Sequence, residues 1–403
     1  MLKQQYEPLE TLAPALFGHV QKWRHVPSGE CVAVKRMELA FAARKRSKSS
    51  ERPVEEDVFA EVKTNLRIQA LGGHPNVLPL RDCIMEDQAV LLVLKFCEKG
   101  ELLGVLNARR AAGQKLDVPR YFAQILRGAR FLHAHDIAHR DLSLENVLVD
   151  DHDCCHITDF GLATQCSGTL PVRPVGKARY MAPETSAALV FEDAQTDEYD
   201  PKAADVWALG VMLYAMLAAR YPFREPLRRD DRFRLLADFG VDYLLEKDDV
   251  DVCGKEGVVD LLRKLLVVDP TKRSTLTDLV SHPALAAADG DATRLASPTK
   301  PPMPTKSAAD RKRQQPEAPK PKATPTAVAH TEGRRFRARS LGRFSGTSLA
   351  SVSPSTPLSE MEKSKQSQSS SPEKPTAAAA PAVASGGSQK SCLTGTLIHK
   401  VLR

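Results

Sequence analysis

Residues 138–149 read AHRDLSLENVLV, and this stretch decides the fold because it spaces an acid and an amide for one kind of chemistry. Asp141 stands five residues before Asn146, and an apolar run follows the amide. A carboxylate can orient the proton of an incoming hydroxyl, and carboxylate and amide oxygens bind Mg²⁺. The pair therefore points to group transfer assisted by a hard cation, and it leaves Ser143, between the two residues, to be explained.

The other parts of such a site occur in further short stretches along the chain. Phosphoryl transfer also needs a positive charge on the donor phosphates. VAVK supplies it by ending in Lys35, and DFG at 159–161 adds a second carboxylate at Asp159. APE ends at Glu184, and DVWALG follows at 205–210. Any one of these motifs is a weak signal, but five of them in this order are specific.

The order and spacing of the motifs resemble the protein kinase family from about Tyr6 to Pro283. The resemblance implies a kinase domain over 1–286 with an α+β bilobal fold. Its small β-rich N-lobe, with one main helix, would span about 1–95, and its larger, mainly helical C-lobe about 98–286. It also implies an ATP- and Mg²⁺-dependent enzyme acting on protein substrates, with YMAPE typical of the serine/threonine type.

The resemblance also assigns roles to individual residues. Lys35 would pair the α- and β-phosphates, Asp141 would orient the substrate hydroxyl, and Asn146 and Asp159 would hold Mg²⁺. The nucleotide would lie against residues of both lobes: Leu12, Gly18, Val20, Ala33, Lys35, Leu94, Phe96, Cys97, Glu101 and Leu148. A buried ion pair of Glu184 with Arg273, and packing by His139 and Phe160, would support the site.

The phosphate loop departs from the family pattern G-x-G-x-x-G-x-V. The stretch at 12–20 reads LAPALFGHV, in which Ala13 and Ala15 replace the first two glycines and Gly18 is kept. Alanine restricts φ, and Pro14 removes a backbone donor, so we expect a stiffer and weaker phosphate cover. An inactive pseudokinase scaffold is therefore the alternative to an active enzyme.

The acid that pairs with Lys35 is uncertain from the sequence. It should lie on the helix expected over 54–71, near Thr64 or Asn65, and neither residue is acidic. Glu61 stands one turn earlier, about 4.5 Å away along the helix axis. Either Glu61 pairs with Lys35 through a shifted register, or the pair is absent.

Ser143 and Lys177 look like an exchanged pair. Serine/threonine kinases usually have a lysine two residues after the catalytic aspartate and a threonine before the APE segment. Here the first position is Ser143 and the second is Lys177. The cation–hydroxyl pair beside Asp141 could be kept with its ends reversed, or both positions could have drifted with Lys177 in solvent.

Arg140 raises a question about activation. In many relatives this arginine binds a phosphate on the activation segment, but the usual phosphorylated position is Arg173 here. A basic residue cannot take that role, which leaves Ser167 and Thr169 as displaced candidates. Activity without phosphorylation of this segment is an equal alternative.

Hydrophobic patterns predict the elements around these motifs. Short β-branched or apolar runs predict strands at 30–37, 76–82 and 89–96. Helical spacing of apolar residues predicts a buried helix face within 116–135. DHDCCH at 151–156 fits no tetrahedral zinc spacing and favours a turn between two short strands.

The C-terminal region has a different composition from the rest. Residues 287–403 are rich in Pro, Ser, Ala and Lys, which predicts a disordered tail. Residues 291–403 carry 19 Lys+Arg against 7 Asp+Glu, so this part is basic while the first 290 residues are mildly acidic. The tail could contact the kinase domain, but no firm nucleic-acid or membrane partner is indicated. Without an apolar leader or an apolar run of 18 residues, we expect an intracellular protein, cytoplasmic or nuclear.

Overall fold

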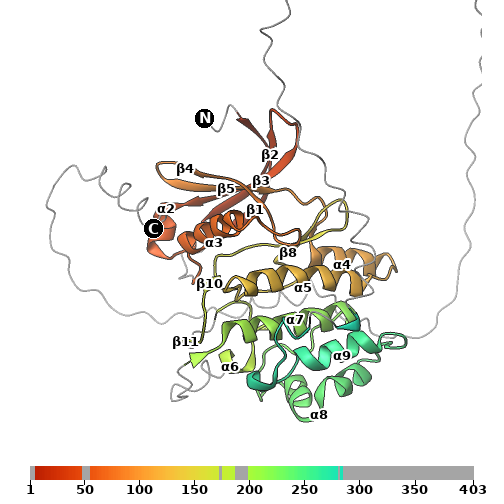
Figure 1. The fold of residues 1–403 in the computed structure, drawn as a ribbon. Helices are drawn as coiled ribbons and strands as arrows, with labels where there is room; N and C mark the ends of the chain where they lie inside the picture. Colours follow the sequence, from red (N-terminus) through yellow and green to blue (C-terminus); the bar gives the residue numbers. More distant parts are fainter. Residues whose placement is uncertain (1–4, 48–54, 172–174, 187–197, 280–281, 285–403) are drawn as a thin grey trace, which may run out of the picture. The chain divides into compact units, whose positions relative to one another are not determined.

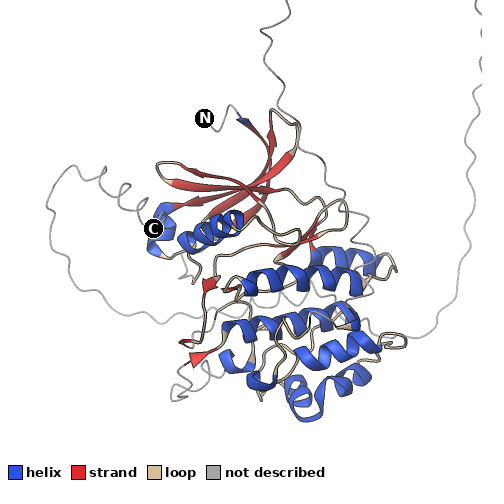
Figure 2. Ribbon diagram, viewed as in Figure 1, coloured by secondary structure: helices blue, strands red, loops and turns tan. Residues whose placement is uncertain are grey.

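The computed structural model describes residues 5–47, 55–171, 175–186, 198–279 and 282–284. A β-sheet with two helices comes first in the chain and a helical region follows (Figures 1 and 2). The α+β bilobal fold implied by the motifs is confirmed. The predicted tail from residue 287 onward lies outside the described residues.

The N-lobe is built on an antiparallel sheet with strand order β1-β2-β3-β5-β4. Its strands are β1 (Tyr6–Ala15), β2 (Gly18–His25), β3 (Cys31–Glu38), β4 (Leu80–Met85) and β5 (Ala89–Lys95). Successive side chains point to opposite faces of a strand. Val32 and Val34 of β3 therefore pack in one apolar cluster, whereas Ala33 and Met37 pack in another beneath the N-lobe helix. Lys35 shares the side of Ala33, which directs its ammonium toward that helix.

The N-lobe helix α3 (Val58–Ala70) packs against the sheet on the Ala33 face, through Val58 and Val62. Asp57 caps it by accepting hydrogen bonds from the N–H groups of Phe59 and Ala60. This cap places the start of the helix four residues after the expected position. A second, short helix, α2 (Leu39–Arg44), follows β3 and was not predicted.

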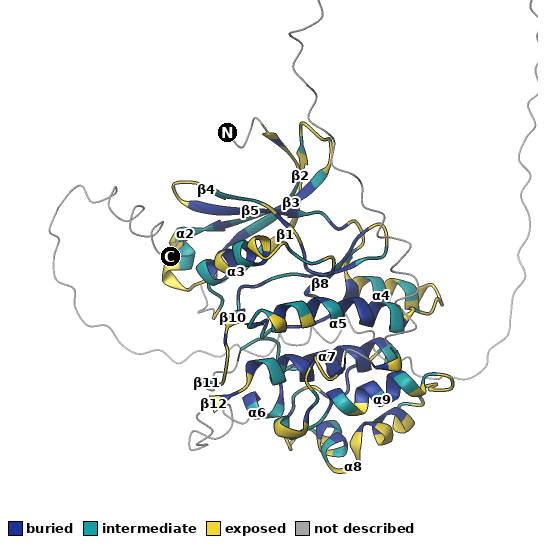
Figure 3. Cartoon of the chain, in the orientation of Figure 1, coloured by how far each residue is buried: buried dark blue, intermediate teal, exposed yellow. Residues whose placement is uncertain are grey.

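The C-lobe is mainly helical. It contains α4 (Leu102–Ala111), α5 (Val118–Ala134), α6 (Pro183–Ser186), α7 (Pro201–Ala218), α8 (Asp231–Lys247), α9 (Glu256–Leu265) and a 3-10 turn (Pro270–Lys272). α7 is buried without interruption from Asp205 to Met216, and α5 and α9 pack against it (Figure 3). α7 is therefore the rigid base on which the lobe is assembled. No helix in the described parts of the chain is both long and apolar enough to cross a membrane.

Short strand pairs position the loops of the C-lobe. β6 (Gly100–Glu101), β8 (Val147–Val149) and β9 (Cys155–Ile157) form one small sheet, and the turn predicted at 151–156 joins β8 to β9. β7 (Ile137–Ala138) pairs with β10 (Thr164–Gln165). β11 (Leu170–Pro171) pairs with β12 (Glu198–Tyr199).

The strand predicted at 76–82 is wrong in its first half, because β4 begins only at Leu80. The preceding residues bind the C-lobe instead: the N–H of Leu78 donates to Ile157 O (2.9 Å), and the N–H of Ile157 donates to Asn76 O (3.0 Å). Pro79 has no N–H to continue a ladder. This segment therefore links the two lobes behind the site.

Candidate active site

The loop at 139–146, which carries Asp141 and is called the catalytic loop below, has a strained backbone and is held by one buried carboxylate. Arg140 has a φ of +66°, which a residue with a side chain rarely adopts. Asp205 of α7, 1% exposed, accepts hydrogen bonds from the N–H groups of Arg140 (2.8 Å) and His139 (2.7 Å). The base helix of the lobe thus fixes the backbone just before Asp141.

His139 holds the loop through both of its ring nitrogens. Its ring is fully buried, and Nε2 lies 2.9 Å from Thr158 O. This carbonyl can only accept, so Nε2 carries the proton and Nδ1 accepts from the N–H of Asp141 at 3.3 Å. Phe160 packs on the ring, with 5.3 Å between the two centroids. These contacts agree with the packing role that the family resemblance implies for both residues.

Asp141 and Asn146 meet directly. Asn146 Nδ2 donates to the carboxylate Oδ2 of Asp141 at 2.7 Å and to its backbone carbonyl at 2.8 Å. Both bonds use the amide nitrogen, which leaves the amide oxygen as a ligand for a cation. The spacing of five residues in the sequence therefore serves to place an acid and an amide side by side.

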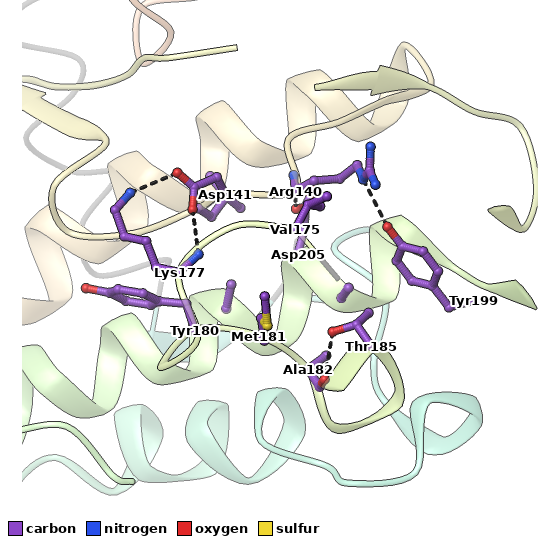
Figure 4. Close-up of a pocket in the computed structure, with 13 residues that line it drawn as sticks. Arg140, Asp141, Val175, Lys177, Tyr180, Met181, Ala182, Thr185, Tyr199 and Asp205 are labelled. Atoms are coloured by element: carbon purple, nitrogen blue, oxygen red, sulfur yellow. Dashed lines mark hydrogen bonds and ion pairs between the residues drawn. The ribbon is translucent and has the colours of Figure 1, made fainter. Parts of the chain in front are cut away.

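Lys177 lies between Asp141 and Ser143, and Figure 4 shows its contacts with Asp141. Its Nζ donates to Asp141 Oδ2 at 2.8 Å and to Ser143 Oγ at 3.1 Å, and its backbone N–H donates to Asp141 Oδ1 at 3.1 Å. Burial opposes the charge of Lys177, but the carboxylate of Asp141 outweighs it and raises the pKa of the ammonium. Of the two alternatives from the sequence, the structure shows the exchanged pair, with Lys177 turned inward.

Gly176 is required for this approach. It has a φ of +86°, and a Cβ at this position would lie 2.7 Å from Arg140 O and 3.0 Å from Asp141 Oδ1. A side chain here would force the segment carrying Lys177 away from the catalytic loop.

Lys35 bridges the two lobes at the other side of the site. Its Nζ lies 2.7 Å from Glu61 Oε1 on α3 and 2.9 Å from Asp159 Oδ1. Burial lowers the pKa of Lys35, but the two carboxylates more than compensate and keep the ammonium protonated. The Lys35 ammonium in turn lowers the pKa of Asp159. The shifted-register alternative for Glu61 is therefore the arrangement that the structure shows.

A further acid, Glu56, lies beside the DFG segment. A Cβ on Gly161 would be 3.1 Å from Glu56 Oε2, and the N–H of Asp57 donates to Gly161 O at 2.9 Å. Burial, followed by the Asp159 carboxylate, raises the pKa of Glu56 to about 7. The start of α3 is thus docked on the DFG segment, and this contact had no signal in the motifs.

The loop that replaces the glycine-rich phosphate cover is a tight hairpin between β1 and β2. Ala15 pairs with Gly18, and the carbonyl of Phe17 accepts from the N–H of Glu38 at 2.8 Å. Phe17 is 3% exposed and packs with Met37 in the N-lobe. A Cβ on Gly18 would approach Arg36 O to 2.0 Å, which explains why this glycine is kept. Phe17, at the tip of the hairpin, is thus bound to the sheet by a hydrogen bond and by packing, which agrees with the expected stiff loop.

The predicted adenine-binding residues come together from four elements. Ala33, Leu94 and Cys97 belong to one buried apolar cluster, and Val20, Phe96 and Leu148 pack against it. Leu148 is in β8 of the other lobe and is the register partner of Glu101. Leu12, in contrast, is 42% exposed and lies outside this cluster.

Glu184 and Arg273 form the predicted ion pair. Arg273 donates to both carboxylate oxygens of Glu184, at 2.7 and 3.1 Å, and its side chain is fully buried. Removing one partner of such a pair leaves a buried charge and costs about 3–5 kcal/mol. This pair fixes the end of the segment that carries Lys177.

A pocket lies next to Asp141 on the side of this segment, and the close-up in Figure 4 shows its lining. Val175, Tyr180, Met181 and Ala182 contribute to it, so its walls are mostly apolar. The pocket is small, with a volume of about 30 Å³, so it has room for little more than a water-sized group beside Asp141.

Two residues of the site were missed by motif reasoning. Asp205 stands in DVWALG, and an acid within an otherwise apolar helix was the available signal. Tyr199 had none, because its contact with Arg140 joins segments 59 residues apart.

Comparison with known proteins agrees with the geometry. The model of the protein kinase domain matches residues 6–285. Serine/threonine-protein kinase SRK2F of Arabidopsis thaliana is 30% identical over 285 residues, which cover 70% of this chain and 73% of that protein. SAPK3 of Oryza sativa subsp. indica, also a serine/threonine-protein kinase, is 31% identical over 286 residues, covering 70% and 77%.

A third relative is much longer than the chain. Serine/threonine-protein kinase GIN4 of Saccharomyces cerevisiae is 35% identical over 225 residues, covering 56% of this chain and 19% of that protein. The chain thus spans about a fifth of the length of this relative. The chain belongs to the protein kinase family.

Proposed function

We propose that the chain is an active protein kinase that transfers the γ-phosphoryl group of ATP to serine and threonine hydroxyls of proteins. The observation that carries this proposal is that Lys35 contacts Glu61 and Asp159 together, at 2.7 and 2.9 Å. A lysine aligned in this way spans the two lobes and can bind donor phosphates. The names of the relatives as serine/threonine-protein kinases support the choice of hydroxyl.

The residues present fit a bound Mg²⁺. Asn146 and Asp159 offer one amide and one carboxylate oxygen, the hard donors that Mg²⁺ prefers, and the other positions would be filled by phosphate and water. When bound, the ion neutralises charge on the transferred phosphate. Lys35 would hold the α- and β-phosphates, and the cluster of Ala33, Leu94 and Leu148 would pack against the adenine.

Asp141 is placed to orient the attacking hydroxyl. Its Oδ2 accepts from Asn146 Nδ2 and Lys177 Nζ, and its Oδ1 accepts from the backbone N–H of Lys177, which fixes the carboxylate in one orientation. A hydroxyl in the adjoining pocket would meet a carboxylate that needs no rearrangement, and such preorganisation lowers the barrier. Lys177 adds positive charge next to the phosphate that passes to the substrate.

A pseudokinase scaffold remains the competing function because of the pinned loop between β1 and β2. The intact contacts of Lys35, Asp141, Asn146 and Asp159 favour the active enzyme. The discriminating experiment measures MgATP binding and label transfer to serine-, threonine- and tyrosine-containing peptides with the wild type and Asp141→Asn. If the chain is an active kinase, both proteins should bind MgATP, and only the wild type should transfer label to the serine and threonine peptides. Binding without transfer by the wild type would establish the scaffold.

The tail could regulate substrate access. The stretch FEDAQTDEYD at 191–200 contains five acids, and the part at 291–403 has a net charge of +12. Tethering gives opposite charges a high effective concentration, and salt should weaken their contact. Truncation at residue 287 should lower KM for a peptide substrate at low salt. An unchanged KM would make the tail a passive linker.

A reducing compartment, cytoplasmic or nuclear, is the setting that fits this function. The seven cysteines of the described residues are free thiols, as is usual where glutathione is reduced.

A further inference from the structure

The side chain of Arg140 has an unexpected partner. Its Nε–H donates to the hydroxyl of Tyr199 at 2.9 Å (Figure 4). Its Nη1 donates to Leu162 O at 3.4 Å. The two groups that its side chain contacts within the described residues, a phenol and a backbone carbonyl, are both uncharged. The guanidinium thus joins the residue that follows DFG to a neutral phenol.

Tyr199 is held rigidly from the C-terminal side. Asp200 caps α7 through the N–H of Lys202 (2.8 Å), so β12 runs straight into the base helix of the lobe. The same helix provides Asp205, which binds the backbone of Arg140. One short stretch therefore fixes both the backbone and the side chain of Arg140.

Tyr199 is also joined to the activation segment. β12 pairs with β11, with Leu170 opposite Tyr199 and Pro171 opposite Glu198. The hydroxyl of Thr169 donates to the carboxylate of Glu198. Tyr199 is 5% exposed, whereas Thr169, Pro171 and Glu198 are exposed, so the tyrosine is the buried end of a surface strand pair. The segment is thus tied to α7 by strand pairing as well as by a side chain.

We propose that the Tyr199 hydroxyl does here what a phosphate on the activation segment would otherwise do, so that Tyr199 is a positioning residue for phosphoryl transfer. It holds Arg140, and through Arg140 and β12 it aligns the catalytic loop with the activation segment without any modification. The residue at the usual phosphorylated position, Arg173, is basic and could not supply the contact. This inference rests on the proposed kinase activity.

The test removes only the hydroxyl, with Tyr199→Phe in the full chain. Loss of a hydrogen bond to a charged group should lower kcat about tenfold while KM for ATP stays unchanged. Amide hydrogen exchange should become faster in residues 164–171, which contain β10 and β11. Treating the wild type with phosphatase should leave kcat unchanged.

The matched control is Tyr214→Phe. Tyr214 is another buried tyrosine, whose hydroxyl donates to Asp248 Oδ2 at 2.5 Å and lies 3.2 Å from Leu244 O, away from the activation segment. The Tyr214→Phe variant should have a lower Tm, with kcat and amide hydrogen exchange in residues 164–171 unchanged. Arg140→Met should lower kcat as Tyr199→Phe does, and the double variant should be little worse than either.

Three results would overturn the proposal: wild-type kcat in Tyr199→Phe, equal losses in Tyr199→Phe and Tyr214→Phe, or inactivation of the wild type by phosphatase. If the wild type transfers no phosphate at all, the proposed function fails. Hydrogen exchange still decides whether Tyr199 aligns the segment, because that measurement needs no activity.

Discussion

Lys177 Nζ lies 3.1 Å from Ser143 Oγ and 2.8 Å from Asp141 Oδ2, so the ammonium joins this hydroxyl to the carboxylate that we propose orients the substrate. The ammonium arrives from the activation segment and the hydroxyl from the catalytic loop. Ser143 is fully buried, and its Oγ also accepts from the N–H of Asn146 at 3.3 Å. Ser143 therefore connects the ammonium of Lys177 to the backbone of Asn146.

This arrangement predicts that Ser143 and Lys177 act as a unit. Ser143→Ala and Lys177→Ala should each lower kcat about tenfold, because each removes a contact that fixes Asp141. The double variant should be little worse than either single variant. Ser143→Lys alone should be inactive because it sets two ammonium groups together, and adding Lys177→Thr should restore activity. Strictly additive losses in kcat would contradict coupling.

The hairpin between β1 and β2 predicts weak nucleotide binding that can be improved. Replacing both Ala13 and Ala15 by glycine should allow closer backbone approach to the phosphates and lower the Kd of MgATP by about threefold. Titration calorimetry of the double variant measures this. Gly18→Ala is the opposite change and should destabilise the N-lobe, because Arg36 O lies in the way. Unchanged or weaker ATP binding in the glycine variant would show that these alanines are not limiting.

Thr169 should be an inhibitory position. Its hydroxyl binds Glu198, so a negative charge at residue 169 would repel that carboxylate and loosen the pairing of β11 with β12. Thr169→Glu should lower kcat several-fold, whereas Ser167→Glu, at a nearby exposed position, should change it little. Activation by Thr169→Glu would show that the segment needs a negative charge there.

His74 should make folding sensitive to mild acid. Burial, with Arg127 and Arg130 nearby, lowers the pKa of His74 to about 4, and its Nδ1 accepts from the N–H of Asn76 at 3.0 Å. Between pH 6.5 and 4 the unfolded chain binds a proton that the folded chain does not, so stability rises with pH in this window.

The free energy of unfolding should therefore fall by about 2 kcal/mol as pH drops from 6.5 to 4, less than the full shift would give because the ring is only half-buried. Urea unfolding of the wild type and His74→Gln at both pH values measures it. An equal drop in the variant would assign the effect to other groups.

The sequence predicted the parts of the site that are local or that belong to ordered motifs. The contact between Asp141 and Asn146 follows from their spacing within one loop. The side of the sheet on which Lys35 lies follows from the alternation of side chains along a strand. The exact starts of a helix and of a strand were harder to predict. The start of α3 depends on Asp57, and β4 begins late because residues before Pro79 bind β9.

Contacts between side chains that are far apart in the chain could not be predicted from the sequence. Tyr199 lies in β12 and contacts Arg140, 59 residues away in the sequence, and a two-residue strand has too little pattern to be recognised. Glu56 reaches Gly161 because the N-terminus of α3 docks on the DFG segment. In both cases tertiary packing, rather than local propensity, decides the neighbour.

The most direct measurement of the central claim is transfer of label from γ-labelled ATP to a serine peptide by the purified full chain, compared with Asp159→Ala. The account predicts Mg²⁺-dependent transfer by the wild type and a loss of at least about a hundredfold in the variant, because Asp159 joins Lys35 to the cation site. Equal transfer by the two proteins, or none by the wild type in the presence of Mg²⁺, would contradict it.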